Sequence, residues 1–467
     1  MHARNTQSVA VDIRELNLDG DGVARQRDRV LIVPFTIPGE RVRVRLDGAQ
    51  PFATLIEVLD PSPFRVTPRC PHFGPCGGCT WQHIAYPEQL RLKTALVERL
   101  VRPLVPEAPA VRPTLSTPAH DADAGPWGYR QKVHFVFAMD EGPPSAGRVP
   151  RPSLVMGHYA RGSRQVVPVQ ECPVHDERGN AVAFQFASSL RTAGVEAARP
   201  ARRSGRCPPQ PGVLQSIAVR VARHTSELMT TLVVRDDSDK RLRAASRRAL
   251  AGSEAATSFH VNLHPRDDRF IFGAETRRIS GHARLREEVG GTSFLMSPDA
   301  FFQTNVDAAE QLVTLVRDAV PAGTSVLDLY AGAGLFALPL ARAGHPVVAV
   351  EENRAAVADG VASQRVNRIF EGQCRFIAQP VETALRRLPP SDVIVLDPPR
   401  SGCSPVVLDW LCRRRPARLV YVSCNPEALA RDLAALRKGG FQIDSMQPVD
   451  MFPHTAHVET VAVMRGE

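Results

Sequence analysis

A glycine-rich turn between a strand-like and a helix-like segment constrains the fold of this chain more than any other feature. Residues 325–329 have the apolar character of a short buried strand, residues 330–334 contain the glycines of a tight turn, and residues 335–343 have helical spacing. A second apolar strand, residues 347–350, leads into Glu351, whose carboxylate can accept hydrogen bonds from ribose hydroxyls. This order predicts a Rossmann-like α/β domain with a nucleotide cofactor at the turn. Many doubly wound domains carry such a turn, so it does not identify the ligand by itself.

Two further apolar segments end in polar residues. Residues 393–396 run into Asp397, within Asp-Pro-Pro-Arg, and residues 418–423 run into Cys424, within Cys-Asn-Pro. In an open α/β sheet the carboxyl ends of the strands form the ligand crevice. We therefore expect Asp397 and Cys424 to lie on the side of the sheet where the cofactor binds.

Four short motifs in this half resemble the RNA uracil-5-methyltransferase family. They are Phe-Phe-Gln-Thr-Asn at 301–305, Asp-Pro-Pro at 397–399, Ser-Cys-Asn-Pro at 423–426 and Met-Phe-Pro-His-Thr-Ala-His-Val-Glu at 451–459. The Asp-Pro-Pro motif is also similar to the base-side motif of nucleic-acid methyltransferases that use S-adenosylmethionine. The resemblance covers almost the whole catalytic half and implies a class I methyltransferase domain.

The resemblance also implies a role for individual residues. Cys424 would be the nucleophile and Glu459 the general base, whereas His454 and His457 receive no catalytic role. Asp397 would hold the base edge of the uracil at the cofactor crevice. The full set at the cofactor site is Gln303, Tyr330, Gly332, Gly334, Glu351 and Asp397.

The chemistry of uracil methylation requires these residue types. Carbon 5 of uracil is a poor nucleophile, and a thiolate that adds to carbon 6 makes carbon 5 able to attack a methyl sulfonium. A free thiol has a pKa of about 8.5, so the site must favour the thiolate. After methyl transfer, a general base must remove the proton from carbon 5 before the thiol can leave.

Two positions depart from the family pattern. Leu335 follows the last loop glycine, where many members carry asparagine, so one polar contact to the cofactor is in doubt. Gln379-Pro380 stands where a polar residue commonly meets the adenine; Gln379 can serve, but Pro380 has no backbone N–H to donate. Neither departure involves the reacting atoms.

Four cysteines outside this domain suit a metal centre. Cys70, Cys76 and Cys79 form a Cys-x5-Cys-x2-Cys pattern, and Cys172 offers a fourth thiolate. Four thiolates fit either an iron-sulfur cluster or structural zinc. The family resemblance extends to this spacing and implies a [4Fe-4S] cluster, with zinc as the alternative. The spacing differs from that of radical S-adenosylmethionine enzymes, so we expect a structural or RNA-binding role.

Length and periodicity predict three domains: residues 1–66, 67–290 and 291–467. Alternating strands in the first form a small OB-like barrel, which resembles a TRAM domain. Its arginines Arg41, Arg43 and Arg45 alternate along one strand, so that one face could meet phosphates.

Period-two strands predict a central β-rich domain that contains the four cysteines. Residues 87–100 predict a helix that packs on the catalytic domain, and residues 102–125 an exposed connector. Residues 129–132, Tyr-Arg-Gln-Lys, resemble the basic and aromatic segment that heads this domain in the family. Residues 199–206 are expected to form an arginine-rich loop that could contact RNA.

Charge and cysteine usage indicate the partner and the compartment. The net charge is +9 and the isoelectric point about 9.4, which favours a polyanionic partner such as RNA. Nine cysteines, an odd number, and the absence of an apolar signal core argue against disulfides, so we expect a reduced, cytoplasmic setting. No stretch has the length and apolar character of a membrane span. We expect a monomer that binds RNA and no membrane.

Together these observations predict a methyltransferase that modifies carbon 5 of uridine, with 23S ribosomal RNA as the favoured substrate. The T-loop of transfer RNA is the alternative substrate. Two other classes remain open: a catalytically weakened RNA-binding iron-sulfur protein, and a methyltransferase for another carbon or nitrogen acceptor.

Overall fold

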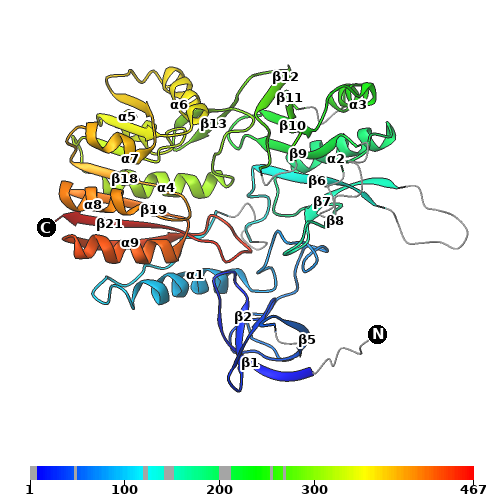
Figure 1. The fold of residues 1–467 in the computed structure, drawn as a ribbon, viewed down its shortest axis with the longest axis horizontal. Helices are drawn as coiled ribbons and strands as arrows, with labels where there is room; N and C mark the ends of the chain where they lie inside the picture. Colours follow the sequence, from blue (N-terminus) through cyan, green and yellow to red (C-terminus); the bar gives the residue numbers. More distant parts are fainter. Residues whose placement is uncertain are drawn as a thin grey trace, which may run out of the picture. The chain divides into compact units, whose positions relative to one another are not determined.

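The computed structural model describes residues 8–46, 50–118, 125–140, 152–198, 212–252, 256–266 and 270–466. They form two compact units, which Figure 1 shows as one ribbon coloured along the sequence. Unit 1 consists of Met1–Thr117, Pro398–Arg415 and Tyr421–Glu467, and unit 2 of Pro118–Asp397 and Pro416–Val420. The arginine-rich segment 199–206 lies outside the described residues.

Unit 1 begins with a five-stranded antiparallel sheet in the order β3-β2-β1-β4-β5. Contacts between β3 and β5 bring the two outer strands together, so the sheet curls as the OB-like prediction requires. In β4 every second residue is buried, and Val42 and Val44 contribute to the apolar core. The strands are β1 (Ser8–Leu16), β2 (Gly22–Gln26), β3 (Arg29–Val33), β4 (Arg41–Leu46) and β5 (Ala53–Asp60).

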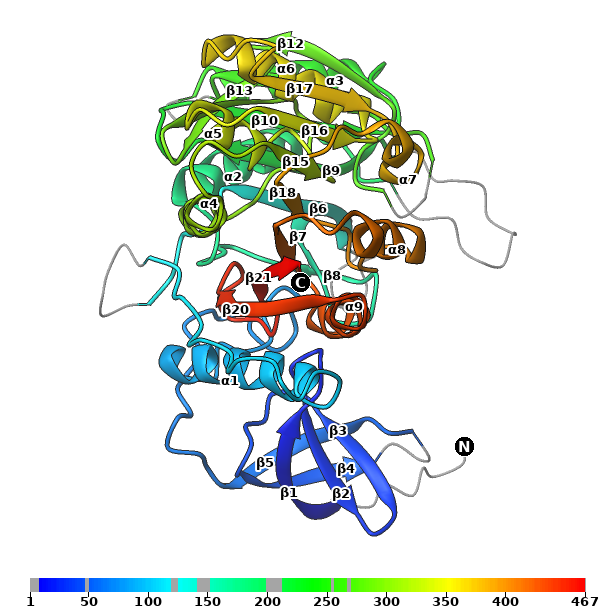
Figure 2. The same cartoon turned by 90° about the vertical axis from the view of Figure 1, so that its left-hand side faces the viewer.

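Helix α1 (Tyr86–Val101) follows in unit 1, close to the predicted bounds, and contacts helix α9 (Pro426–Lys438) and strand β20 (Phe441–Val449). The views in Figures 1 and 2 both show α1 beside α9. The segment after α1 is not the exposed connector that we expected, because Leu115 pairs with Val449 and its N–H donates to the Pro448 carbonyl at 2.9 Å. Residues 112–117 therefore brace β20.

Unit 2 contains a mixed sheet in the order β12-β11-β10-β9-β6-β7-β8. The period-two pattern predicted a β-rich domain, but not the two helices α2 and α3, which pack on each other. Helix α3 links the only parallel pair among the described strands of this sheet, β10 and β11, as a crossover must. The elements are β6 (Lys132–Asp140), β7 (Ser153–Tyr159), β8 (Val166–Pro168), α2 (Glu177–Thr192), β9 (Leu214–Val221), β10 (Leu228–Val234), α3 (Lys240–Leu250), β11 (Ser258–Leu263) and β12 (Glu275–Ser280).

The C-terminal strands have the order β17-β16-β15-β18-β19-β21-β20. The pairs among β15 to β18 are parallel, and all residues of β15 and β18 are buried, as in a Rossmann-like sheet covered on both faces. Unit 2 holds β15 (Val326–Leu329), β16 (Val347–Glu351), β17 (Cys374–Ala378) and β18 (Val393–Leu396), and the two units divide within β19 (Arg418–Ser423). Strand β21 (Glu459–Gly466) pairs antiparallel with β20 in unit 1.

Helices surround these strands within each unit. In unit 2, α5 contacts both α4 and α6, and a β-hairpin contacts α4, α5 and α6. In unit 1, α8 contacts α9. The elements are the hairpin β13 (Leu285–Val289) and β14 (Thr292–Met296), then α4 (Val306–Ala319), α5 (Ala337–Arg342), α6 (Arg354–Val366), α7 (Val381–Ala384), the 3-10 helix η1 (Leu385–Arg387) and α8 (Pro405–Arg414).

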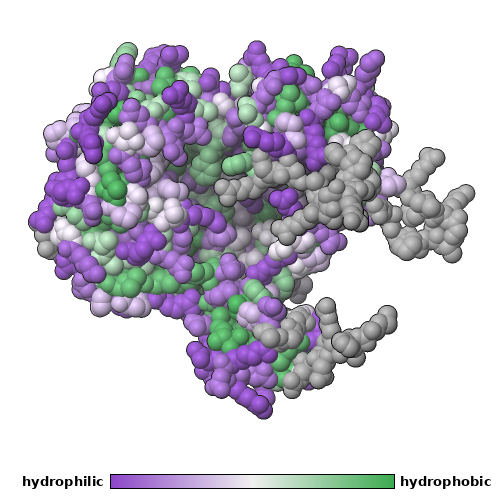
Figure 3. All heavy atoms as spheres, in the orientation of Figure 1, coloured by the Kyte–Doolittle hydropathy of each residue, from purple (hydrophilic) through white to green (hydrophobic). Residues whose placement is uncertain are grey.

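None of the helices within the described residues combines the length and apolar character that a membrane span requires. The face in Figure 3 carries mostly hydrophilic residues, with hydrophobic residues between them in small groups.

Candidate active site

The glycine turn after β15 has the backbone of a ligand-binding loop. Tyr330, directly after the strand, has a φ of 64°, which is uncommon for a bulky side chain and occurs where the surrounding structure imposes it. Gly334 has a φ of 87°, and a Cβ atom there would lie 2.8 Å from the ring of Phe376. Only glycine fits this position without strain, and its missing side chain keeps the loop close to the strands.

Glu351, at the end of β16, is joined to this loop. One carboxylate oxygen accepts a hydrogen bond from the Gly332 N–H at 2.9 Å, and the other accepts one from the Asn353 N–H at 2.7 Å. Glu352 is exposed instead. The structure therefore places Glu351 at the glycine turn.

Three carboxyl groups of unit 2 form an acidic group, defined here as Asp328, Glu351 and Asp397. Burial and, to a smaller extent, the charge of Glu351 together raise the pKa of Asp397 to about 7. Burial also raises the pKa of Asp328 well above its usual range, and the charges of Asp397 and Glu351 add to this effect. Like charges oppose each other's ionisation, so a positively charged ligand would stabilise the ionised acidic group.

Asp328 was not among the predicted site residues. It is fully buried, and neither carboxylate oxygen has a hydrogen-bond partner among the described residues. The available signal was a carboxylate within an otherwise apolar strand, directly before the glycine turn. A buried acceptor with no partner beside a glycine loop fits a cofactor that carries both hydrogen-bond donors and a positive charge.

Gln303 lies on a loop that the Tyr-Arg-Gln-Lys segment holds in place. The Gln131 N–H donates to the Thr304 carbonyl at 2.7 Å, and the Gln131 side-chain oxygen accepts from the Val306 N–H at 3.0 Å. Gln303 itself is half-buried. Gln131 therefore fixes the loop before α4 on which Gln303 is carried.

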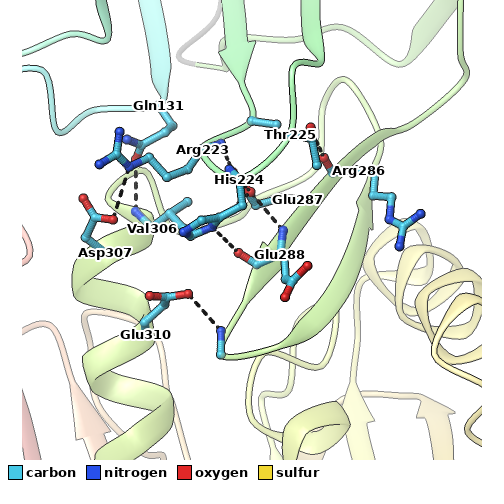
Figure 4. Close-up of polar contacts among 12 residues, drawn as sticks. Gln131, Arg223, His224, Thr225, Arg286, Glu287, Glu288, Val306, Asp307 and Glu310 are labelled. Atoms are coloured by element: carbon cyan, nitrogen blue, oxygen red, sulfur yellow. Dashed lines mark hydrogen bonds and ion pairs between the residues drawn. The ribbon is translucent and has the colours of Figure 1, made fainter.

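Figure 4 shows the hydrogen bond between Gln131 and Val306 together with the contacts of Glu287, which also belongs to unit 2. The buried Glu287 carboxylate accepts from the backbone N–H groups of Arg223 and, at 3.0 Å, His224. The Arg223 side chain reaches Asp307 of α4 at 3.3 Å. The β9–β10 turn of the central sheet is thus tied to β13 and to α4.

Cys424 lies between the end of β19 and the first turn of α9. It is a half-buried thiol directly before the N-cap residue of α9, and a helix N-terminus favours a thiolate. The side chain of Asn425 caps α9 by accepting from the Glu427 N–H at 3.0 Å, and donates to the Arg400 carbonyl at 2.8 Å. Asn425 therefore fixes the turn that presents the thiol and ties it to the Asp-Pro-Pro-Arg segment.

Glu459 is the first residue of β21 and is buried, with 4 % of its surface exposed. In the antiparallel pair it stands opposite Val449, the last residue of β20. The residues between these strands, Asp450–Val458, form a connection that we call the C-terminal loop. Glu459 is therefore fixed at the base of this loop.

The predicted site residues are distributed over both units. Unit 2 brings Gly332 and Glu351 into contact, and the Asp397 N–H donates to the carbonyl of Leu329, just before Tyr330, at 3.3 Å. Unit 1 holds Cys424 and Glu459.

Three of the predicted metal ligands share one loop of unit 1. Cys70, Cys76 and Cys79 are partly exposed thiols. The loop turns tightly, since the Phe73 N–H donates to the Cys70 carbonyl at 3.1 Å and the Gly78 N–H donates to the Cys76 sulfur at 3.4 Å. Soft thiolates on a tight loop fit either iron-sulfur or zinc chemistry.

Cys172, in unit 2, has two histidine neighbours that we did not predict. Single ligand atoms of His158, Cys172 and His175 all lie within 4.8 Å of one another. His175 follows Cys172 at a Cys-x2-His spacing, which was the available signal, whereas His158 stands 14 positions before Cys172 and carried none. These residue types suit a zinc-like ion as well as the surroundings of a thiolate-bound cluster.

The two departures from the family pattern lie in different surroundings. Leu335 is buried, with 9 % of its surface exposed. Gln379 is half-buried and Pro380 is exposed. Gln379 follows β17, whose neighbour is the Glu351 strand β16, so its position does not oppose the expected role at the adenine.

Known proteins are similar to this chain over most of its length. The family model described as tRNA (uracil-5-)-methyltransferase matches residues 223–466, and that of the TRAM domain matches residues 3–54. An uncharacterized RNA methyltransferase of Thermosynechococcus vestitus is 36 % identical over 98 % of both chains. A second, from Gloeobacter violaceus, is 35 % identical over 98 % of this chain and 96 % of its own.

A solved structure is similar over nearly the full length. It is the Pyrococcus abyssi tRNA (uracil-54, C5)-methyltransferase in complex with S-adenosyl-L-homocysteine, with a TM-score of 0.75, 24 % identity and coverage of 98 % of this chain and 100 % of its own. This likeness confirms the predicted Rossmann-like methyltransferase fold.

Proposed function

We propose that this chain, which belongs to the RNA uracil-5-methyltransferase family, methylates carbon 5 of a uridine in 23S ribosomal RNA with S-adenosylmethionine as methyl donor. The observation that carries the proposal is the position of Cys424, a half-buried thiol at the N-terminus of α9 on a turn fixed by Asn425. Methyl transfer to oxygen or to an amino group needs no thiol, whereas carbon 5 of uracil does.

Cys424 starts the proposed reaction. Its thiolate forms a bond from sulfur to carbon 6 of the uracil, and the electron pair of the carbon 5 to carbon 6 double bond moves toward carbon 5 and the carbonyl at carbon 4. When bound, S-adenosylmethionine would supply an electrophilic methyl group, which would pass to carbon 5 while its bond to the sulfonium sulfur breaks and leaves a neutral thioether. The target uridine must be flipped out of any stack, because the sulfur approaches carbon 6 from the face of the ring.

Glu459 completes the reaction as general base. It removes the proton from carbon 5, the double bond to carbon 6 forms again, and the thiolate of Cys424 leaves. Its burial and its place in the β20–β21 pair support this role, because a base held by a strand has a fixed direction.

Residues of unit 2 would hold the methyl donor. The glycine turn and Tyr330 would allow its close approach, and Glu351 would accept hydrogen bonds from its ribose hydroxyls. Gln303 and Asp397 would contact its reactive end and the edge of the uracil. The acidic group supports this assignment, because a sulfonium is a cation and stabilises the carboxylates that otherwise repel one another.

The four cysteines Cys70, Cys76, Cys79 and Cys172 would hold a [4Fe-4S] cluster with a structural or RNA-binding role. The chemistry of four thiolates supports this assignment, and the histidines beside Cys172 keep zinc as the alternative.

The three-part division at residues 66 and 290 would place RNA recognition in the barrel and the central domain, in a cytoplasmic monomer. The face of the barrel that carries Arg41, Arg43 and Arg45 supports RNA binding less strongly than we predicted from the sequence. Arg43 pairs with Glu57 at 2.8 Å, and Arg41 stands opposite Asp12 and Asp60 in the sheet, so neighbouring carboxylates offset part of its charge.

The test is nucleoside-resolved mapping of 5-methyluridine in ribosomal and transfer RNA from a strain that lacks this protein. We expect the loss of a site in 23S ribosomal RNA that the wild-type chain restores and Cys424→Ala does not. Restoration of the same site by Cys424→Ala would exclude the covalent mechanism.

Transfer RNA is the second candidate substrate, because the Pyrococcus abyssi protein of the same fold is named for uracil 54 of transfer RNA. In the mapping experiment, loss of 5-methyluridine from transfer RNA with intact ribosomal RNA would favour this alternative.

A further inference from the structure

We infer that Gln89 and Lys93, on helix α1, are positioning residues for the C-terminal loop and, through it, for Glu459. Neither residue lies in a catalytic motif, and they precede the loop by about 360 positions, yet all of these residues belong to unit 1. The inference rests on the proposed role of Glu459 as the base, and concerns what holds this base in place.

Lys93 anchors the start of the loop. Its ammonium group pairs with the Asp450 carboxylate, and both side chains are completely buried. The same nitrogen donates to the Phe452 carbonyl at 3.1 Å and lies 5.9 Å from the centre of the Trp81 ring. Two fully buried charges are costly to desolvate, so such a pair contributes to a specific arrangement more than to stability.

The backbone of Asp450 is held as firmly as its side chain. Its N–H donates to the Leu115 carbonyl at 2.9 Å, and its carbonyl accepts from the Thr117 hydroxyl. Asp450 follows Val449 directly, and Val449 is the residue opposite Glu459. A shift of Asp450 would therefore move the strand pair that contains the base.

Gln89 anchors the middle of the loop at His454. Its side-chain oxygen accepts from the His454 N–H at 2.8 Å, while its nitrogen donates to the Ile84 carbonyl at 2.8 Å. His454 has a φ of 63°, and a side chain rarely adopts this conformation unless its neighbours impose it. Gln89, only 1 % exposed, is one of those neighbours.

The loop that carries Cys70, Cys76 and Cys79, which we call the cysteine loop, is also hydrogen-bonded to His454 through the residues that follow it. Thr80 and Trp81, which follow Cys79 directly, both donate their N–H groups to the His454 carbonyl, at 3.0 and 2.9 Å. Trp81 also packs with Ala456 of the C-terminal loop and donates from its ring to the Gly20 carbonyl of the barrel at 2.9 Å. Helix α1, the cysteine loop and the barrel thus converge on the C-terminal loop.

A positioning role predicts a defect in one particular step. If the loop shifts, Cys424 can still add to carbon 6 and methyl transfer can still occur, whereas removal of the carbon 5 proton by Glu459 becomes slow. A misplacement of about 1 Å can slow a step on the order of 100-fold. The methylated covalent complex should therefore accumulate.

The experiment uses the full-length protein with its metal centre, S-adenosylmethionine and RNA with ordinary uridine in single-turnover reactions. The covalent protein–RNA complex and the released methylated RNA are measured separately for wild type, Lys93→Met and Gln89→Leu. We expect formation of the covalent complex within about twofold of wild type and release slowed by on the order of 100-fold. Arg99→Met is the matched control, since this α1 cation pairs with Glu15 at the surface and should leave both rates unchanged.

The outcomes are separable. Equal losses of complex formation and release, in variants that unfold at the wild-type temperature, would overturn the inference. If Lys93→Met does not fold, Lys93→Met with Asp450→Leu removes both buried charges and is measured in its place, beside Gln89→Leu. Glu459→Gln is the reference: if that variant accumulates no covalent complex, the proposed base is wrong, whatever the α1 variants do.

Discussion

The carboxylate of Glu351 accepts the Gly332 N–H at 2.9 Å, so that the end of one parallel strand holds the glycine loop that follows its neighbour. This bond gives the loop a defined shape before any ligand binds. The second carboxylate oxygen is held by Asn353, and the lone pairs left on both oxygens can accept ribose hydroxyls.

Replacement of Glu351 should therefore weaken binding of S-adenosylmethionine. For Glu351→Gln we expect a 10- to 100-fold loss of affinity by calorimetry, about 1.4 to 3 kcal/mol, because charge-assisted hydrogen bonds are lost. Glu352→Gln, at the exposed neighbour, should bind as wild type does. Equal losses in both variants would remove Glu351 from the cofactor site.

Gly334→Ala should destabilise the catalytic domain and weaken cofactor binding. The substitution combines a φ of 87° with a Cβ atom 2.8 Å from the Phe376 ring. We expect a loss of about 1 to 3 kcal/mol in the free energy of unfolding, measured by denaturant titration.

A second variant, Gly344→Ala, distinguishes the strain of a positive φ from the steric contact with Phe376. Gly344 has a similar φ of 95°, but no atom lies within 4 Å of a Cβ built there. The variant should lose only the conformational part, about 1 kcal/mol. Equal losses at Gly334 and Gly344 would show that the contact with Phe376 contributes nothing.

The pH dependence of cofactor binding should follow Asp397, whose pKa is raised to about 7. Below pH 7 the carboxyl group is mostly protonated and neutral, and above it the carboxylate attracts a cation. Affinity for S-adenosylmethionine should therefore rise between pH 6 and pH 8 and then level off, and binding should release protons. Asp397→Asn should flatten this profile in calorimetry, and an unchanged slope would assign it to another group.

The stability of the free protein should change with pH in the opposite direction. Because the folded pKa of Asp397 lies above the value in the unfolded chain, the folded state binds more protons between about pH 4 and pH 7. This group's contribution to the free energy of unfolding is then largest at low pH and falls as pH rises through 7. In Asp397→Asn the decline should be smaller, as thermal unfolding at pH 6 and pH 8 can measure.

Covalent catalysis can be tested with RNA that contains 5-fluorouridine at the target position. Fluorine cannot be removed as a proton, so the wild-type protein should stay attached through Cys424, with a matching shift in mass. Cys424→Ala should form no adduct and no 5-methyluridine, whereas Glu459→Gln should still accumulate a covalent species. Cys412→Ala, a partly exposed cysteine without an assigned role, is the control. A wild-type protein that binds both ligands and forms no adduct would contradict the mechanism.

The sequence predicted local features well and distant contacts poorly. Strands β18 and β19 have the predicted bounds, because each is a short, mostly apolar run that ends at a polar motif. Helix α2 was missed because Phe184 and Phe186 alternate as strand residues do. No local pattern could indicate that Lys93 pairs with Asp450 across 357 positions, or that His158 approaches Cys172. Such contacts depend on the tertiary fold and carry no periodic signal.

The ligands of the metal centre can be assigned by removing one candidate group at a time. With a cluster on four thiolates, protein purified without oxygen should contain about four iron atoms and four sulfides per chain. Cys76→Ser and Cys172→Ser should both lose them, while His175→Ala should keep them, because in this assignment the histidine is a neighbour and not a ligand. Zinc at the histidines would give the reverse: about one zinc per chain, lost in His158→Ala, His175→Ala and Cys172→Ser but kept in Cys76→Ser. Cys172 belongs to both candidate ligand sets, so the contrast between Cys76→Ser and His175→Ala decides between them.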